Sequence, residues 1–307
     1  MLEPEMVTYG SLFPSRFTNP IAAMQKSASC SGSEQSTVTP ITRRAMAAIP
    51  DTFVFNEIGP VSTQLARLNQ SLAVKRETRM DVEAFRSMVR DRRSVRGYRI
   101  DPVPREVIED IIDIAGGAPS SMNTQPWHFH VLTGEPLDLI RQGNTERMVN
   151  GASPQREIPL NHGYEGAHRD RQIEIAVQLF ESMGIAWEDK ERRRDWAMRG
   201  FRQFDAPVSI VVTCDRTLEN DAVGHFDCGA VTYGLVLAAW TKGLGCVING
   251  QGIMQSDVVR EHANIPEDQV IMTCVAMGYP DDDFVANDVK STRRPVEEVA
   301  NFVGFDD

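Results

Sequence analysis

The sequence is that of an acidic chain of 307 residues, in which 43 Asp and Glu outnumber 32 Lys and Arg and give a net charge of −11. Because the charge is negative and no basic stripe is interleaved with aromatic residues, nucleic acid is not an expected partner. No run of 18 apolar residues predicts a membrane span, and no N-terminal pattern predicts a secretory signal. The five cysteines form no C-x-x-C pair and four lie in apolar runs, which is typical of buried thiols in a reducing compartment, so we expect a cytoplasmic protein.

Residues 1–79 differ from the rest of the chain. They are rich in Ser, Thr, Pro and Met, and their hydrophobic periodicity is weak. This composition is typical of an arm or a partly disordered extension, and packing on a partner subunit is the alternative. From residue 80 the pattern becomes regular, and residues 80–307 are predicted to form a separate domain with a large core.

Hydrophobic spacing predicts helices and strands throughout residues 80–307. In chain order these are helix 81–92, helix 104–116, strand 127–132, helix 137–148, a helical stretch at 170–204, strand 207–214, helix 221–242, strand 245–248, helix 257–265, strand 269–278 and a helix or crossing tail at 296–303. Asp81 is a suitable N-cap for the first helix. The helix 221–242 is apolar on nearly all sides, as in a core or at a subunit interface. The loop 150–170 is long enough to be a lid or binding loop.

Three polar side chains alternate directly after the first predicted helix. Arg92, Ser94 and Arg96 would face one side of an extended segment. Two guanidinium groups and a hydroxyl on one face suit a phosphate or a polar flavin edge. A surface cluster of arginines paired with carboxylates is the alternative.

Three further segments carry candidate binding groups. Residues 118–127 supply hydroxyl and amide groups, which can bind a polar heterocycle or cap the local backbone. Residues 249–253 place two glycines after a strand, where the backbone can approach a ligand or simply turn. Arg293 is a candidate phosphate anchor or part of a solvated tail. His128 and His130 lie two apart on a strand, but the sequence offers no further ligands at a metal-binding spacing.

In their order along the chain, these motifs resemble those of the flavin-dependent nitroreductase family. The matching patterns are R-R-S-x-R-x-Y at 92–98, P-S-S-x-N-x-Q-P-W at 119–127, N-G-Q-G at 249–252 and R-x-P-x-E-E at 293–298. The resemblance covers about residues 80–307, and residues 1–79 have no counterpart in the short members of the family. It implies an α+β fold with a mostly antiparallel central sheet flanked by helices, in a domain-intertwined homodimer.

The resemblance also implies which residues bind flavin mononucleotide (FMN). Arg92, Arg93, Ser94 and Arg96 match residues that hold the phosphate, the ribityl chain and the N1/O2 edge, Arg93 being the least certain of them. Pro119, Ser120, Ser121, Asn123 and Gln125 match residues that reach the flavin of the other subunit. Gln251 and Gly252 match the turn against the isoalloxazine, and Arg293 matches a phosphate-binding arginine. Many relatives have Lys two positions before that arginine; this chain has Ser291 there, which puts a role of the adjacent Lys290 in doubt.

The activity implied is a ping-pong cycle in which NADPH or NADH reduces FMN and a nitroaromatic or quinone-like acceptor then receives two electrons. The cofactor carries the chemistry, so no catalytic side chain is expected, while Arg96 would stabilise the reduced, anionic flavin. His162, Tyr164 and His168 could line the substrate mouth. A flavin-dependent reductive dehalogenase or another specialised enzyme of the fold is one alternative, and a noncatalytic flavin-binding protein is another.

Overall fold

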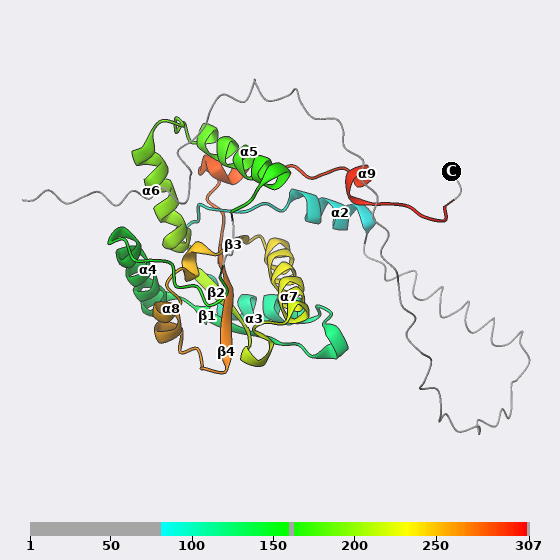
Figure 1. The fold of residues 1–307 in the computed structure, drawn as a ribbon, viewed down its shortest axis with the longest axis horizontal. Coiled ribbons are helices and arrows are strands. Elements are labelled where there is room, and N and C mark those ends of the chain that lie inside the picture. The colour runs from blue at the N-terminus through cyan, green and yellow to red at the C-terminus, as the bar shows by residue number, and fades with distance from the viewer. Residues whose placement is uncertain (1–80, 160–162, 306–307) are drawn as a thin grey trace, which may run out of the picture. The chain divides into compact units, whose positions relative to one another are not determined.

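A four-stranded sheet between two helical layers forms the centre of the fold (Figure 1). The computed structural model describes residues 81–159 and 163–305, so the expectations for residues 1–79 and for His162 lie outside the described residues. The strand order is β1-β2-β4-β3, and each pair of neighbouring strands is antiparallel. The predicted α+β class with a mostly antiparallel sheet is therefore confirmed.

The four strands lie where the sequence predicts them. Their bounds are β1 Trp127–Leu132, β2 Val208–Asp215, β3 Gly245–Asn249 and β4 Gln269–Gly278. Most residues of β2 and β4 are buried, because helices cover both faces of the sheet. Ile210 of β2 pairs with Val131 on one side and Val275 on the other, and a β-bulge interrupts the β2–β4 register after Val212.

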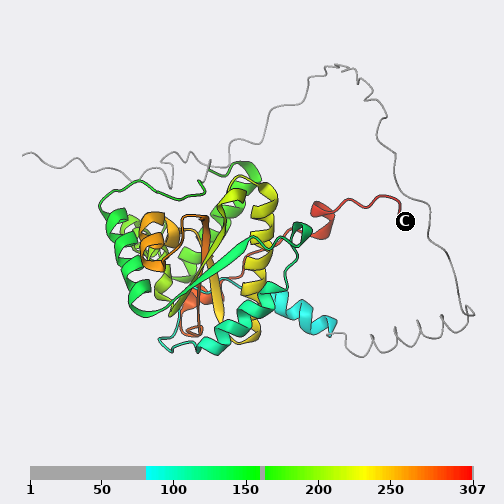
Figure 2. The same ribbon diagram turned by 90° about the horizontal axis from the view of Figure 1, so that it is seen from below.

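Helices pack on both faces of the sheet (Figures 1 and 2). Those on one face are α3 Arg105–Gly116 and α7 Ala222–Thr241; those on the other are α4 Gly134–Val149 and α8 Ser256–Ala263. The remaining α-helices of the described residues are α2 Val82–Asp91, α5 Gly166–Ser182, α6 Lys190–Phe201 and α9 Val296–Val299. Short 3-10 turns are η1 Ser121–Asn123, η2 Gln203–Asp205, η3 Arg216–Leu218, η4 Gln251–Ile253 and η5 Val285–Asp288. The predicted N-cap of α2 is confirmed, since the Asp81 carboxylate accepts a hydrogen bond from Glu83 N.

The helical stretch predicted at 170–204 is two helices, α5 and α6, and not one. Gly184 lies between them with φ +60°, a backbone conformation that favours glycine and ends a helix. Arg192 of α6 donates to the carbonyl oxygens of Met183 (3.0 Å) and Gly184 (2.6 Å), which satisfies the end of α5. The helix or tail predicted at 296–303 contains one helical turn, α9, followed by extended chain.

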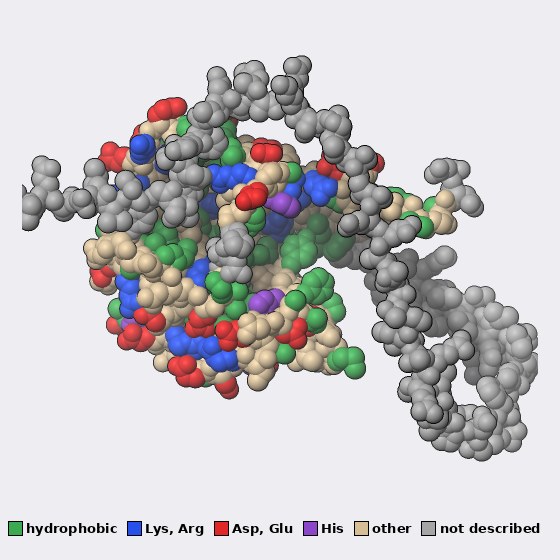
Figure 3. All heavy atoms as spheres, viewed as in Figure 1, with side chains coloured by type: hydrophobic (Ala, Val, Ile, Leu, Met, Phe, Trp, Pro, Cys, Tyr) green, Lys and Arg blue, Asp and Glu red, His purple; other side chains and the backbone are tan. Residues whose placement is uncertain are grey.

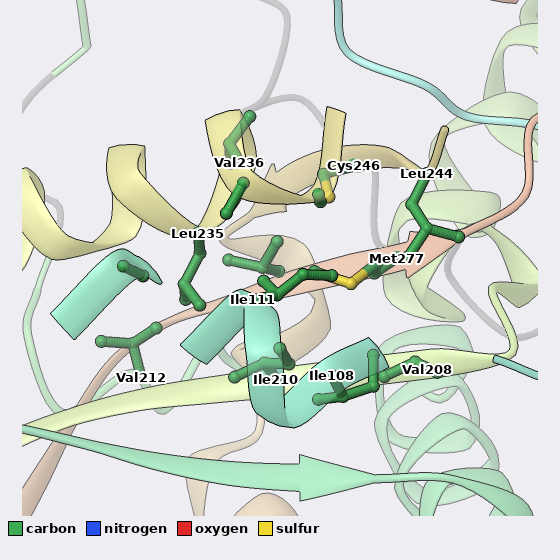
Figure 4. Packing of buried hydrophobic residues seen from close by; sticks show 14 of the residues in the cluster. Ile108, Ile111, Val208, Ile210, Val212, Leu235, Val236, Leu244, Cys246 and Met277 are labelled. Carbon is green, nitrogen blue, oxygen red and sulfur yellow. The ribbon is translucent and has the colours of Figure 1, made fainter. Parts of the chain in front are cut away.

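A cluster of buried side chains between α3, α7 and the sheet fixes the position of β3 (Figure 4). Ile111 of α3 and Leu235 of α7 are fully buried and belong to one cluster with Ile210 and Met277 of the sheet. Burying one such side chain contributes about 1.5–3 kcal/mol relative to leaving it exposed. Cys246 of β3 belongs to the same cluster, so the core anchors the strand beside which the candidate site lies.

The helix α7 has one face in the core and one apolar face at the surface. Val231, Leu235 and Ala239 are buried, whereas Phe226 is 77% exposed and Tyr233 is 43% exposed. By length and composition alone, α7 is the one helix of residues 81–159 and 163–305 that could cross a membrane. Half of it is buried inside the fold, and core helices of soluble proteins also have this length and composition.

Candidate functional site

The segment after α2 runs alongside β3 in an extended conformation. Val95 N–H donates to Cys246 O at 3.0 Å, and Ser94 forms a parallel bridge with Cys246. Val95 is buried, whereas Arg92, Ser94 and Arg96 are half-buried. Arg93 is half-buried as well, and the placement of Arg92, Ser94 and Arg96 on one side of the segment stays a prediction.

Asn287 of η5 holds this segment in place, although no sequence motif pointed to it. Its side chain is buried, and its Oδ1 accepts hydrogen bonds from Arg96 N (2.8 Å) and Gly97 N (3.1 Å). Its Nδ2 donates to Gly97 O and to Asp281 O, both at 2.9 Å. Gly97 has no room for a side chain, because a Cβ there would lie 2.3 Å from the ring of Phe284. Residues 96 and 97 are thus fixed by a residue 190 positions away.

Arg93 is held by other parts of the protein. Its Nε donates to Asn287 O, its guanidinium lies 3.5 Å from the Asp288 carboxylate, and the same group lies 5.9 Å from the ring centre of Trp240. These contacts use the charge and the donors of Arg93 within the fold. Arg93 therefore has fewer donors left for a ligand, and it was the least certain of the predicted flavin-binding arginines.

Arg92, Arg96 and Arg199 bring three guanidinium groups to the same region, and those of Arg92 and Arg199 are incompletely satisfied within the described residues. The Nε atoms of Arg92 and Arg199 are buried and have no acceptor among the described residues. Arg199 of α6 donates to Arg96 O at 3.2 Å, and Arg96 reaches back to Ser94 O at 3.3 Å. Burial lowers the pKa of Arg96 and of Arg199, but guanidinium groups remain protonated. Desolvated cations without a carboxylate partner favour an anionic ligand.

The turn after β3 is built by side chains that hold its backbone. Asn249 donates from Nδ2 to Gly200 O (2.7 Å) and accepts from Gln251 N (3.0 Å). Asn144 of α4 donates to Gln251 O at 2.9 Å. Gly252 is buried, and a Cβ there would lie 2.6 Å from Gln203 Cγ. Gly252 therefore lets the turn pack against the core. From the sequence alone, a glycine here could equally have allowed the backbone to approach a ligand.

The loop between α3 and β1 is anchored to α7 and exposed at its tip. Ser121 N–H donates to the buried carboxylate of Asp227 at 3.0 Å, and Ser120 Oγ accepts from Gln125 N at 3.0 Å. Asn123 and Gln125 have φ of +61° and +47°, so the loop holds left-handed backbone conformations that non-glycine residues rarely adopt. Five residues of this loop are predicted to reach a flavin: Pro119, Ser121, Asn123 and Gln125 are exposed, and Ser120 is half-buried.

Within one chain, this loop lies far from the arginine segment. The loop contacts Asp227 near the N-terminal end of α7, whereas Arg93 lies over Trp240 near its C-terminal end. Asp227 and Trp240 are thirteen positions apart in the helix, which corresponds to about 20 Å along its axis. The structure therefore brings together the residues around 92–96 and the turn after β3, and it leaves the loop 118–125 apart from them.

The C-terminal segment passes the end of α2. Lys290 lies 3.6 Å from the carboxylate of Asp91, directly before Arg92. Arg293 is exposed and donates to Ser291 O, Ser291 Oγ and Thr292 O. Lys290 thus has a structural ion pair, whereas the hydrogen bonds of Arg293 stay within its own segment.

Basic side chains also line a cavity of about 440 Å³ on the outer side of α6. Its lining includes Arg192, Trp196, Arg199 and Arg202, so it shares Arg199 with the site described above. On the face shown in Figure 3, basic side chains gather around α5 and the adjoining end of α2. None of the residues predicted to bind flavin lines this cavity.

The histidines of β1 form hydrogen bonds across the sheet. His128 Nε2 lies 2.8 Å from the Asp215 carboxylate, and His130 Nε2 lies 2.8 Å from Gln269 Oε1. Residues 81–159 and 163–305 contain no group of three His, Cys, Asp or Glu side chains that could hold a metal ion. Within the same residues, the cysteines are free and buried, as predicted; these are Cys214, Cys228, Cys246 and Cys274.

Known proteins resemble the chain in sequence and in fold. The model of the nitroreductase family matches residues 89–279. A chloronitrobenzene nitroreductase of Comamonas testosteroni is 34% identical over 223 residues, which are 70% of this chain and 95% of that protein. A 4-nitrobenzoate reductase of Nocardioides sp. is 30% identical over 230 residues, which are 74% of this chain and 92% of that protein.

Solved structures of nitroreductases are similar to the chain in fold. The FMN and NADPH-dependent nitroreductase NfnB from Sphigopyxis sp. strain HMH superposes with a TM-score of 0.68 at 28% identity, covering 71% of this chain and 98% of that one. The FMN-dependent nitroreductase NfnB from Mycobacterium smegmatis, solved in complex with NADPH, gives a TM-score of 0.67 at 25% identity, with 72% and 98% covered.

Proposed function

The chain belongs to the nitroreductase family, and from this premise we propose that it is an FMN-dependent enzyme that uses NADPH or NADH to reduce nitroaromatic compounds. The observation that carries the proposal is the set of half-buried arginines beside β3 whose donors lack acceptors within the described residues. We place the enzyme in the cytoplasm, because its described thiols are free and buried. We also propose that residues 1–79 form an extension apart from a flavin-binding domain at 80–307.

The residues present suit an FMN phosphate and ribityl chain. Arg92 and Arg293 would bind the phosphate, because a guanidinium forms paired hydrogen bonds to phosphate oxygens. Ser94 would bind the ribityl chain. Arg96 would face the N1/O2 edge, where its positive charge stabilises negative charge on the ring. The unsatisfied buried Nε of Arg92 supports this arrangement, since an uncompensated buried donor is costly without a ligand.

The same proposal needs a second copy of the chain. Pro119, Ser120, Ser121, Asn123 and Gln125 would complete the flavin site of a partner subunit, because their loop lies about 20 Å along α7 from the arginine segment. Small and apolar residues form an exposed stripe on α7 at helical spacing: Val223, Phe226, Gly229 and Tyr233. An apolar stripe of this kind is typical of an obligate dimer interface.

The C-terminal segment supports an intertwined arrangement of that dimer. Residues 291 and 292 lie against α5, and the segment that carries α9 then extends away from the helical layers (Figure 2). Val299, Phe302, Val303 and Phe305 are between 61% and 79% exposed in the single chain. Large apolar side chains gathered in an exposed tail favour burial against another protein surface, and a second copy of this chain would supply that surface.

The chemistry divides between cofactor and protein. When bound, FMN takes two electrons from NADPH or NADH and passes them to the acceptor. The protein orients the ring through the turn at Gln251, and Gly252 fixes that turn against the core. Arg96 supplies positive charge at the ring edge, and no side chain is required as nucleophile or general base.

A spectroscopic experiment tests the cofactor and the activity together. The full chain is reconstituted with FMN, freed of excess cofactor and titrated with NADPH without oxygen. We expect retained flavin absorbance that NADPH bleaches and nitrobenzene restores, with continuous NADPH oxidation when both are supplied. A chain that retains no flavin contradicts the proposal. Retained flavin without NAD(P)H oxidation indicates a noncatalytic flavoprotein, and turnover of a halophenol without nitro reduction indicates a reductive dehalogenase.

Two matched arginine variants test the site within that experiment. Arg92→Ala should raise the Kd for FMN about 10- to 100-fold, which is the effect of losing charged hydrogen bonds to phosphate. Arg86→Ala is the control, because Arg86 is an exposed arginine of α2 that pairs with Glu83 in the same chain. Equal FMN affinity in the two variants would remove Arg92 from the site.

A further inference from the structure

The segment at residues 155–157 is pinned to the core at two points. Gln155 N–H donates to Met254 O at 2.8 Å. The Glu157 carboxylate accepts two hydrogen bonds from Arg260, at 3.0 and 2.6 Å, and one from Ile271 N at 2.9 Å. Both anchors lie within the fold, so the backbone of Arg156, which lies between them, has a fixed position.

Arg156 extends from this fixed backbone to the turn after β3. Its Nη1 lies 2.7 Å from the position that a Cβ would occupy on Gly250, so the guanidinium covers the face of that glycine. Gly250 directly precedes Gln251, the residue that we propose lies against the flavin ring. A side chain at position 250 would displace the guanidinium, so the glycine leaves the space that Arg156 fills.

Among the residues that the structure describes, no carboxylate forms an ion pair with Arg156. Its Nε is buried and finds no acceptor among residues 81–159 and 163–305. The neighbouring Glu157 is already bound by Arg260 and also lies 3.6 Å from Arg216. Burial lowers the pKa of Arg156. A surface arginine would ordinarily pair with an acid or point into solvent.

We propose that Arg156 binds the anionic substituent of the electron acceptor, so that the enzyme favours nitroaromatic compounds that carry a carboxylate. This inference rests on the proposed function, because it needs the flavin ring at the turn of Gln251. A guanidinium binds a carboxylate through two parallel hydrogen bonds and orients it. An acceptor held in this way above Gly250 would lie next to the ring that reduces it.

A pair of ligands that differ only in charge tests the contact without turnover. Isothermal titration of the FMN-loaded chain measures the Kd of benzoate and of neutral benzamide. In Arg156→Gln the Kd of benzoate should rise about 10- to 100-fold, the effect of losing a charged, bidentate contact. The Kd of benzamide should change by no more than about twofold. Arg156→Lys, which keeps the charge and loses the second hydrogen bond, should fall between the wild-type chain and Arg156→Gln.

Turnover should show the same discrimination. The kcat/KM for 4-nitrobenzoate should fall about 10- to 100-fold in Arg156→Gln, whereas that for nitrobenzene should stay within about twofold. Arg147→Gln is the matched control, because it removes the same charge from an arginine of α4 that pairs with Asp257. Arg147→Gln should leave the kcat/KM for 4-nitrobenzoate and for nitrobenzene unchanged.

Each contrary result has a distinct meaning. Unchanged benzoate affinity in Arg156→Gln overturns the inference, and so does a rise in the KM for NADPH with benzoate affinity retained, which would make Arg156 a nucleotide-phosphate ligand. Loss of FMN from Arg156→Gln would make it a flavin ligand and overturns the inference as well. A wild-type chain that retains no FMN overturns the proposed function itself, whereas the other results leave that function standing.

Discussion

At the scale of single residues, Asn287 connects the fold to the proposed cofactor site. Its amide satisfies two backbone N–H groups and two carbonyl oxygens, and three of these four groups belong to residues 96 and 97. The contact is buried, so water cannot replace the lost hydrogen bonds easily. The Asn287 side chain therefore helps to hold Arg96 beside β3, together with the Val95–Cys246 backbone hydrogen bond.

Asn287→Ala should reduce both stability and cofactor binding. Leaving several buried backbone groups unsatisfied should lower the free energy of unfolding by about 2–4 kcal/mol. Urea denaturation measures this change, and the FMN Kd should rise in parallel because the backbone of Arg96 is no longer held. Asn220→Ala, at an exposed asparagine, is the control and should change neither quantity. An Asn287→Ala chain as stable as the wild type would show that the amide is dispensable.

The sequence predicted residues that carry charge and missed those that hold them. Arg92, Ser94 and Arg96 could be predicted because they alternate within five positions, and local spacing determines which side an extended segment presents. Asn287 could not, because its partners lie about 190 positions away and a lone asparagine has no pattern. Gly252 was predicted as a flavin contact from its place in a glycine-containing turn, and its packing against Gln203 became visible only in the fold.

At the scale of elements, α7 has an internal face and an external one. The internal face packs on α3 and the sheet, and the external face carries exposed apolar side chains, with Phe226 at 77% exposure. The sequence predicted a helix that is apolar on nearly all sides, which a core or an interface would explain equally. In the fold, half of this helix is buried in the core. The sequence was predicted only as a helical stretch over 170–204, and the break at Gly184 became visible in the fold.

Phe226→Glu should dissociate the proposed dimer without unfolding the chain. Phe226 makes little contact within the single chain, so its replacement should change the stability of the monomer by no more than about 0.5 kcal/mol. A carboxylate placed in an apolar interface is costly to desolvate, so the assembly should shift toward monomer. Light scattering coupled to gel filtration measures the mass. Ile100→Glu, at a residue 98% exposed, is the matched control; an unchanged dimer in both variants would place the interface elsewhere.

At the scale of the whole molecule, burial keeps acidic groups of the interior neutral. Burial raises the pKa of Cys274 to about 12 and also raises the pKa of Cys228 and Cys246 above the ordinary value of 9.0. Tyr98, whose hydroxyl lies 2.6 Å from Val95 O, likewise has a pKa raised well above 10.0 by burial. These groups keep their protons in the folded chain at a pH at which the unfolded chain loses them. The sequence predicted buried thiols from their apolar surroundings, but not the resulting dependence on pH.

The free energy of unfolding should therefore fall in alkaline solution. Below about pH 9 the thiols are protonated in both states and contribute no slope; between about pH 9 and 12 the unfolded chain releases protons that the folded chain retains, so stability decreases as pH rises. Urea denaturation at a series of pH values measures the slope. Repulsion within an acidic chain adds a fall of its own, so a Cys246→Ala/Cys274→Ala variant is the necessary comparison. That variant is less stable at every pH because it leaves cavities, yet its alkaline slope should be shallower, and an equal slope would show that the thiols do not set it.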